Sequence, residues 1–145
     1  MQTYTHIGVY GILVRDHQVL LVQKARGPHI HKWDFPGGSI EFGEEPYETL
    51  KREFAEETGL TDIAGIIRKA SSYTLIYPSR ETELEHLHHI GIIYDVEASS
   101  GLEKLRSDGD GQDSLGARWI RLEELGRMEV TPFVQEWISS RMKQG

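Results

Sequence analysis

Cysteine is absent from the 145-residue sequence, which excludes a disulfide framework. The absence fits a reducing compartment, and we expect a cytoplasmic protein. A long apolar run is missing too: residues 1–18 lack a basic region, and threonine, histidine and glycine interrupt their apolar positions. We therefore expect neither a signal peptide nor a membrane span.

Runs of lysine and arginine are also missing, and the chain has a net charge of −7. This balance argues against nonspecific binding to duplex DNA, which needs a basic surface. No repeat or linker divides the sequence, and its length suffices for one hydrophobic core without covalent crosslinks. The sequence therefore indicates a single domain over residues 1–145.

Acidic residues, in contrast, are concentrated in one segment. Residues 41–57 hold seven acids and two bases, a net charge of −5 out of the total of −7. Glu53, Glu56 and Glu57 are spaced i, i+3 and i+4, so on a helix their carboxylates project from one face. Like charges so close repel each other unless a cation lies among them, and oxygen ligands favour Mg²⁺ or Mn²⁺. A solvated acidic helix face is the alternative interpretation.

The same segment carries the signals of a helix. Pro46 suits the first helical position, Glu45 and Glu48 form a weak capping box, and Gly59 can end the helix in the left-handed conformation. The apolar stripe of this helix consists of Tyr47, Leu50 and Phe54. We expect the helix to pack inward on that stripe and to present its acids sideways.

Strand composition recurs on both sides of this helix. The first two strands are expected to form a hairpin around Asp16 and His17, and the next two a longer hairpin. Residues 99–114 are rich in Gly, Ser and Asp and are expected to form a loop, as are the residues from Arg26 to the double glycine. The expected order is strands 6–14 and 19–23, helix 46–58, strands 63–77 and 87–96, strand 117–122 and helix 131–142. This order favours a mixed sheet between helices.

One run of residues resembles a family signature. Gly38, Glu44, Arg52, Glu53, Phe54, Glu56, Glu57, Gly59 and Leu60 fill the pattern G-x5-E-x7-R-E-U-x-E-E-x-G-U, where U is a bulky apolar residue. This pattern resembles the Nudix hydrolases. The flanking residues 33–38 and 119–125 also look like those of the family, so the resemblance extends over the whole chain.

The resemblance implies a fold and an activity. The fold would be α/β, a Nudix-type α/β/α sandwich with a central mixed sheet. The activity would be metal-dependent attack of water on a diphosphate linkage, which releases a nucleoside monophosphate from a nucleotide-type substrate. A nucleotide-sensing module without turnover is the alternative. Family members often form homodimers, so a homodimer is possible here.

The resemblance also assigns roles to residues. Glu53 and Glu57 would be metal ligands together with the carbonyl of Gly37, and Glu56 would be another ligand or the base that takes a proton from the attacking water. Arg52 would orient these carboxylates. Glu44 is expected to shape the loop before the helix. Because the base varies in this family, the downstream acids are alternatives, namely Glu81, Glu83, Glu85 and Glu97.

Substrate contacts are less constrained by the sequence. Arg26 could bind phosphate, as could Lys24 and Lys32, with solvated side chains as the alternative. Trp33 and Phe35 could stack on a base, with burial in the core as the alternative. Tyr77 stands where the dinucleoside polyphosphate hydrolases of the family have a tyrosine, although this marker is not specific.

Histidines are a last group of candidates. His29 and His31 could contact substrate, while His86 and His88 would share one face of a strand. A zinc site is conceivable there, but no accompanying motif supports it.

Overall fold

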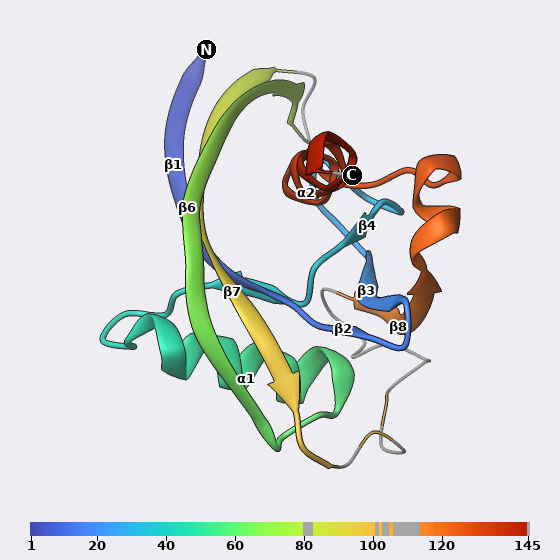
Figure 1. Ribbon diagram of the computed structural model, residues 1–145. Coiled ribbons are helices and arrows are strands. Elements are labelled where there is room, and N and C mark those ends of the chain that lie inside the picture. Colours follow the sequence, from blue (N-terminus) through green and yellow to red (C-terminus); the bar gives the residue numbers. More distant parts are fainter. Residues whose placement is uncertain (80–82, 101, 103–104, 106–113, 145) are drawn as a thin grey trace.

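The computed structural model describes residues 1–145 except 80–82, 101, 103–104, 106–113 and 145 (Figure 1). Among the described residues, the structure has two α-helices, eight strands and a 3-10 helix, η2, which lies between β8 and α2. The elements are β1 (Gln2–Ile12), β2 (Val14–Arg15), β3 (Gln18–Lys24), β4 (Trp33–Asp34), β5 (Gly37–Ser39), α1 (Pro46–Thr58), β6 (Ile63–Pro78), β7 (Leu84–Ala98), β8 (Ser114–Arg121), η2 (Leu122–Arg127) and α2 (Pro132–Gln144).

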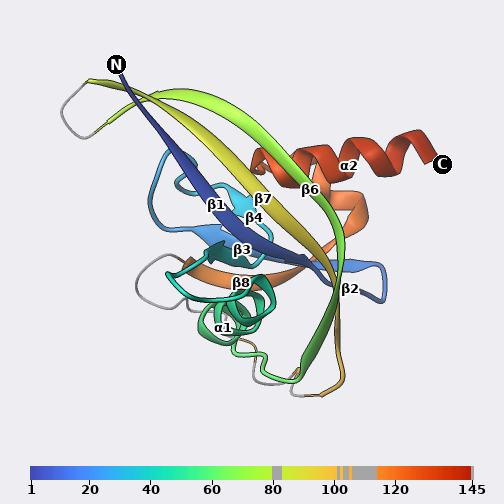
Figure 2. The ribbon, with the colours of Figure 1, turned by 90° about the vertical axis from the view of Figure 1, so that its left-hand side faces the viewer.

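The strands form two sheets that lie between the helices (Figure 2). One sheet has the order β5-β1-β7-β6, and in the other β3 pairs with β2, β4 and β8. The pairing of β1 with β7 is parallel, whereas the other strand pairs are antiparallel. The chain therefore has the mixed α/β architecture that the sequence predicts.

Alternation along the central strands creates two cores. Val9 of β1 and Leu20 of β3 belong to the cluster that contains Phe54 of α1. Their neighbours Tyr10 and Leu21 point the other way, into the cluster that contains Trp137 of α2. Because both faces of these strands are apolar, each face needs a helix to cover it, which gives the sandwich its layers.

The first predicted hairpin is wrong in its extent. Of the expected first strand, only the end that forms β2 pairs with β3. The turn between them contains Asp16 and His17, whose φ angles of 52° and 62° are those of a tight turn. Most of β1 instead pairs in parallel with β7, with Tyr10 opposite Ile93. The turn at Asp16 and His17 was predicted correctly because its signal is local. The partner of β1 was not, because a strand that is apolar on both faces can pair with β3 or with β7, and residues distant in sequence determine the pairing.

The predicted helix is confirmed at both ends. Helix α1 begins at Pro46, where the backbone N–H of Glu45 donates to Glu48 Oε1 at 3.3 Å. It ends at Gly59, whose φ of 83° is left-handed and whose N–H donates to the carbonyl of Ala55 at 3.1 Å. Leu50 and Phe54 are fully buried, as the apolar stripe requires.

The remaining elements agree with the sequence in most places. The long hairpin exists, with β6 paired to β7 from Ile63 opposite Ala98 to Pro78 opposite Leu84. The fifth expected strand, at 117–122, and the second expected helix, at 131–142, correspond to β8 and α2. The expected loop at 99–114 lies mostly outside the described residues. The short strands β4 and β5 replace part of the expected loop before α1.

In the described part of the chain, no helix combines the length and the apolar composition needed to cross a bilayer.

Candidate functional site

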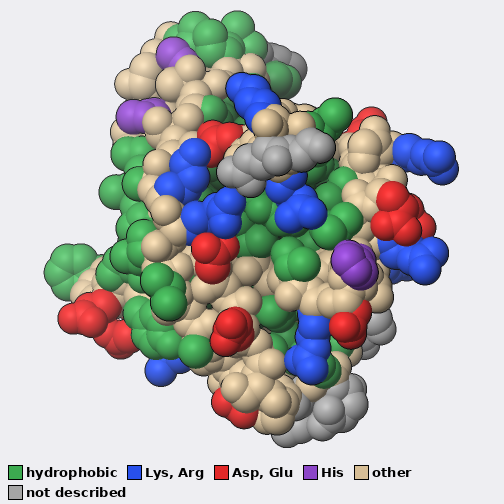
Figure 3. All heavy atoms as spheres, in the orientation of Figure 1, with side chains coloured by type: hydrophobic (Ala, Val, Ile, Leu, Met, Phe, Trp, Pro, Cys, Tyr) green, Lys and Arg blue, Asp and Glu red, His purple; other side chains and the backbone are tan. Residues whose placement is uncertain are grey.

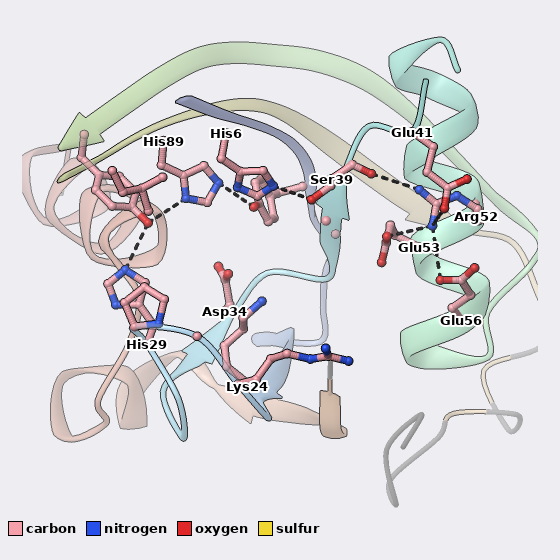
Figure 4. A pocket seen from close by; sticks show the side chains of 18 of the residues that line it. His6, Lys24, His29, Asp34, Ser39, Glu41, Arg52, Glu53, Glu56 and His89 are labelled. Atoms are coloured by element: carbon pink, nitrogen blue, oxygen red, sulfur yellow. Dashed lines mark hydrogen bonds and ion pairs between the residues drawn. The ribbon is translucent and has the colours of Figure 1, made fainter. Parts of the chain in front are cut away.

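Arg52 is the centre of a network of carboxylates on α1 (Figure 4). Its Nε and one terminal nitrogen donate to the two oxygens of Glu44 at 2.8 and 3.0 Å. The other terminal nitrogen donates to Glu53 Oε1 at 2.9 Å and to Glu56 Oε2 at 3.3 Å. Arg52 also donates to the carbonyl of Ser39 at 3.0 Å, which ties the helix to β5.

Glu44 holds the loop before the helix, as predicted. Besides the two bonds from Arg52, its Oε1 accepts from the backbone N–H of Glu41 and from the hydroxyl of Thr49, each at 2.9 Å. These donors favour the ionised form, and the Arg52 bonds contribute most to lowering the pKa of Glu44 to about 2. Glu44 therefore remains a carboxylate and fixes the position of the guanidinium.

Glu53 and Glu57 form a buried pair on the face of α1 that meets the glycine turn. Glu57 is 1% exposed, and its Oε1 accepts from the N–H of Gly37 at 2.9 Å. Burial raises the pKa of Glu57 well above its ordinary value, and the charge of Glu53 adds to this effect. Burial likewise raises the pKa of Glu53, while Arg52 opposes the shift. Two carboxylates held so close together favour sharing a cation or a proton.

The two glycines leave space for this pair. A Cβ on Gly38 would lie 2.7 Å from the carboxyl carbon of Glu53. A Cβ on Gly37 would lie 2.0 Å from the carbonyl oxygen of Val9. A side chain at position 37 would require the backbone to move, and one at position 38 would displace the carboxylate of Glu53, so the double glycine allows β5 to lie directly against α1.

The structure does not bring all three predicted ligands together. The carboxylate of Glu56 turns to Arg52 and is 53% exposed. Over the residues that the structure describes, no group of three or more His, Cys, Asp or Glu side chains is arranged to hold a metal ion. The convergent acids are the pair Glu53 and Glu57, with Glu56 at their edge.

The chemistry of the pair nevertheless fits a hard divalent cation. Glu57 Oε2 is buried and has no hydrogen-bond partner, a costly state that a cation would relieve. All donors here are oxygens, the ligands that Mg²⁺ and Mn²⁺ prefer. Glu53 and Glu57 are the residues that could hold such an ion.

A cavity of about 820 Å³ opens beside the carboxylates and is lined by residues from both sheets and α1. Arg52, Glu53 and Glu56 lie on one side of it (Figure 4). His6, His29 and His89 lie on the opposite side. Lys24 and Arg26 also line it and supply positive charge. The volume suits a small-molecule ligand.

The opposite side of the cavity is a chain of hydrogen-bonded rings. His29 Nε2 contacts the hydroxyl of Tyr73 at 3.1 Å, and this hydroxyl contacts His89 Nδ1 at 2.9 Å. His89 Nε2 contacts the hydroxyl of Tyr10 at 2.8 Å. Burial is the main cause that lowers the pKa of His89 to about 3 and that of His29 to about 4. We call these four residues the imidazole–phenol wall, and it is uncharged at neutral pH.

Sequence reasoning missed most of this wall and also Asp34, a buried cavity residue. Tyr10, Tyr73 and His89 come from β1, β6 and β7 and meet only in the folded sheet. One signal was available: in a strand, His89 must face away from the predicted pair His86 and His88. Within the described ranges, His86 and His88 belong to no group of three or more His, Cys, Asp or Glu that could hold a metal ion.

The predicted substrate residues are scattered. Arg26 lines the cavity, whereas Trp33, Phe35 and Tyr77 do not. Phe35 is 1% exposed and packs edge-on against Trp137, so the stacking role is wrong and the core alternative holds. Trp33 lies under the guanidinium of Arg118 at 5.8 Å. Tyr77 bonds to Tyr4 and to Glu85.

The downstream acids are no nearer to the cavity. Glu81 lies outside the described residues, and Glu83, Glu85 and Glu97 do not line the cavity. Two exposed acids among the described residues do line the cavity, Glu56 beside the buried pair and Glu41 in the loop before α1.

Residues 4–140 match the NUDIX domain family. The chain belongs to the Nudix family. The signature that pointed to it corresponds to β5, the loop after it and α1, where its acids, arginine and glycines form the network described above.

Curated relatives of this Nudix chain carry several names. The chain is 30% identical over 127 residues to the ADP-ribose pyrophosphatase of Methanocaldococcus jannaschii, covering 86% of this chain and 68% of that protein. It is 38% identical over 47 residues to the 8-oxo-dGTP diphosphatase of Escherichia coli, covering 32% and 36%. The E. coli match is therefore confined to about a third of each protein.

Solved structures agree on the Nudix fold. The MutT NUDIX hydrolase from Burkholderia pseudomallei superposes with a TM-score of 0.65 at 23% identity, covering 94% of this chain and 97% of that one. At this identity the likeness shows the fold alone.

Proposed function

We propose that this protein hydrolyses a diphosphate linkage in a nucleoside diphosphate joined to another group, with Mg²⁺ or Mn²⁺ as cofactor. One observation carries the proposal. Glu57 is buried against the glycine turn with one oxygen left without a partner, and its neighbour Glu53 lines a cavity that basic residues also line. The family is made up largely of pyrophosphohydrolases, which is consistent with this chemistry.

Each side of the cavity has a role in the proposal. A divalent cation, when bound, lowers the pKa of the attacking water and neutralises charge on the phosphoryl oxygens. Arg52 holds Glu53 and Glu56 in position, and Glu56 is exposed enough to accept the proton of the attacking water. Lys24 and Arg26 line the cavity and attract the phosphates.

A nucleotide-type small molecule is the proposed partner. The relatives are named ADP-ribose pyrophosphatase and 8-oxo-dGTP diphosphatase. ADP-ribose and 8-oxo-dGTP both contain a nucleoside and a phosphoanhydride and differ in the rest of the molecule. Figure 3 shows Lys and Arg side chains and Asp and Glu side chains together on one face of the molecule.

A substrate panel tests the proposal. The protein is incubated with Mg²⁺ and a mixture of dNTPs, ADP-ribose, dinucleoside polyphosphates and 5′-triphosphate RNA, and products are resolved by mass. We expect monophosphate release from at least one substrate and its loss on chelation. Binding without turnover for every candidate would instead support the nucleotide-sensing alternative.

Replacement of Glu57 by glutamine tests the metal pair directly. Glu57→Gln should reduce kcat/KM by at least about 100-fold, because it removes a proposed ligand. Its Tm should not fall, because a buried charge facing Glu53 is removed as well. Glu124→Gln, an exposed acid on η2, is the matched control. A Glu57→Gln protein with full Mg²⁺-dependent activity would contradict the assignment.

A further inference from the structure

His29 carries a buried nitrogen that has no hydrogen-bond partner. The side chain is half-buried and lines the cavity, and its Nε2 belongs to the imidazole–phenol wall. Its Nδ1 is buried and contacts no donor or acceptor among the described residues. A buried polar atom without a partner costs free energy, so Nδ1 marks a point where a bound molecule would stabilise the protein.

The wall contains one more proton than its hydrogen bonds use. Burial is the main cause that lowers the pKa of His29 to about 4 and that of His89 to about 3, so at neutral pH each imidazole carries a single N–H. Each of the two tyrosines carries a single O–H. The wall therefore has one donor proton per residue, while three hydrogen bonds join its four residues. One proton is left over.

Only two arrangements satisfy all three bonds, because His89 and Tyr73 can each donate only once. In the first, every bond points from Tyr10 toward His29. His29 Nε2 then accepts from Tyr73, and the remaining proton lies on His29 Nδ1. In the second, every bond points toward Tyr10, so the remaining proton belongs to the Tyr10 hydroxyl and His29 Nδ1 is bare.

The first arrangement leaves fewer buried groups without a partner. Tyr10 is 2% exposed, and within the described part of the chain its hydroxyl has no partner besides His89. The second arrangement would therefore leave a buried O–H without an acceptor as well as a bare Nδ1 on His29. The first leaves only the N–H of His29 Nδ1, and an acceptor on a ligand would satisfy that group.

The surroundings of His29 indicate an acceptor that is an anion. Residues 24–32 include Lys24, Arg26 and Lys32 and no acid. The charges of Lys32 and Lys24 act on His29, and Lys24 and Arg26 line the same cavity. Figure 4 shows Lys24 between the histidine side and the carboxylate side of the cavity. Positive charge attracts negatively charged oxygens, and in a nucleotide these belong to the phosphates.

We propose that His29 is a substrate-binding residue whose Nδ1–H donates a hydrogen bond to a phosphate oxygen, and that Tyr10, through His89 and Tyr73, holds His29 in this tautomer. The inference rests on the proposed function, because it takes the ligand to contain a diphosphate. It adds a neutral donor to the charged residues that the proposed function assigns to the phosphates. Because Nδ1 is buried, we expect the ring of His29 to tilt toward the cavity when the ligand binds.

The tautomer can be measured by NMR. Long-range proton–nitrogen correlation spectra of isotope-labelled histidines distinguish an Nδ1–H ring from an Nε2–H ring. We expect both His29 and His89 to carry the proton on Nδ1. The Nδ1 resonance of His29 should shift when methylenediphosphonate, a diphosphate that cannot be hydrolysed, is added with Mg²⁺, and adenosine should leave it unchanged. An Nε2–H ring at His29, no shift with methylenediphosphonate, or an equal shift with adenosine would overturn the proposal.

Two variants separate ligand binding from the structural role of His29. Counted in bonds from Cβ, the amide nitrogen of asparagine takes the position of Nδ1, and that of glutamine takes the position of Nε2. His29→Asn therefore keeps the proposed donor and loses the contact with Tyr73, whereas His29→Gln does the reverse.

Calorimetry with methylenediphosphonate and Mg²⁺ compares these variants. The Kd should rise about 10-fold in His29→Gln and change by less than about 3-fold in His29→Asn. A merely structural role predicts the opposite order, because only His29→Gln keeps the wall intact. No binding to the wild type, equal Kd values for wild type and His29→Gln, or a larger loss in His29→Asn would overturn the proposal.

Failure of this proposal and failure of the proposed function give different results. Binding of methylenediphosphonate that depends on His29, in a protein that hydrolyses none of the panel substrates, would refute the proposed function and leave the role of His29 intact. Hydrolysis of a panel substrate by His29→Gln with the kcat/KM of the wild type would refute the role of His29 and leave the proposed function intact.

Discussion

Arg52 organises three carboxylates with a single guanidinium. Its planar fork binds both oxygens of Glu44 and still reaches Glu53 and Glu56 with its other terminal nitrogen. The nearby acids favour its charged form and raise the pKa of Arg52 further, so the guanidinium stays charged. Arg52 thus offsets the repulsion among these carboxylates by its charge, and the planar shape of its guanidinium allows it to bind all three at once.

Lysine at this position should therefore be a poor substitute. Arg52→Lys keeps the charge but loses the planar fork, so a lysine cannot reproduce the paired bonds to Glu44 together with the bond to Glu53. We expect kcat/KM to fall by about 10- to 100-fold, the range seen when a group that orients metal ligands is removed. Arg68→Lys, whose partner Asp95 lies on an exposed surface, is the control. Equal activity of Arg52→Lys and wild type would argue against an orienting role.

Helix α1 is the element that presents this network, and its end is set by one backbone conformation. Gly59 has a φ of 83°, and its N–H closes the last turn. Any residue with a Cβ is strained there. A shift of the last turn would move Glu57, which lies two residues before the cap.

Substitution of this glycine should cost stability. Gly59→Ala should lower the free energy of unfolding by about 1 kcal/mol, which corresponds to a Tm decrease of about 3 °C for a chain of this size. Gly126→Ala is a matched control, because a Cβ there would meet nothing within 4 Å. Thermal unfolding of both variants compares the strain directly, and an unchanged Tm for Gly59→Ala would contradict the cap.

At the scale of the whole molecule, the hydrogen bonds of the imidazole–phenol wall link four segments that are distant in sequence: β1, β6, β7 and the loop before β4. Its histidines are held neutral by burial, with the pKa of His89 lowered to about 3. In the unfolded chain the same imidazole has a pKa of about 6.5. The imidazole of His89 therefore binds a proton much less readily in the folded protein than in the unfolded chain.

Stability should depend on pH for this reason. The contribution of neutral His89 is fully present above about pH 6.5 and is lost as the pH falls below that value toward 3, because protons then favour the unfolded chain. The Tm difference between wild type and His89→Gln should thus shrink as the pH falls from about 7.5 to about 5.5. His88→Gln, exposed on the other face of β7, is the control. A pH-independent difference for His89→Gln would refute the assignment of a neutral ring.

The sequence by itself determined the features that depend on near neighbours. Helix α1 follows from Pro46, its apolar stripe and Gly59, and the contacts of Arg52 with Glu53 and Glu56 follow from spacing along one helix turn. The family could be read from the same residues, because the signature is nearly continuous in the chain. Local contacts of this kind need no knowledge of the rest of the fold.

Only the tertiary structure decided which distant residues meet. From its sequence, strand β1 could have paired with β3 or with β7. Its parallel pairing with β7 places Tyr10 beside His89. The same packing buries Phe35 and points Asp34 into the cavity, although the two are adjacent in sequence. Adjacent residues of an extended chain face opposite sides, and which side becomes core and which becomes cavity depends on the elements that cover them.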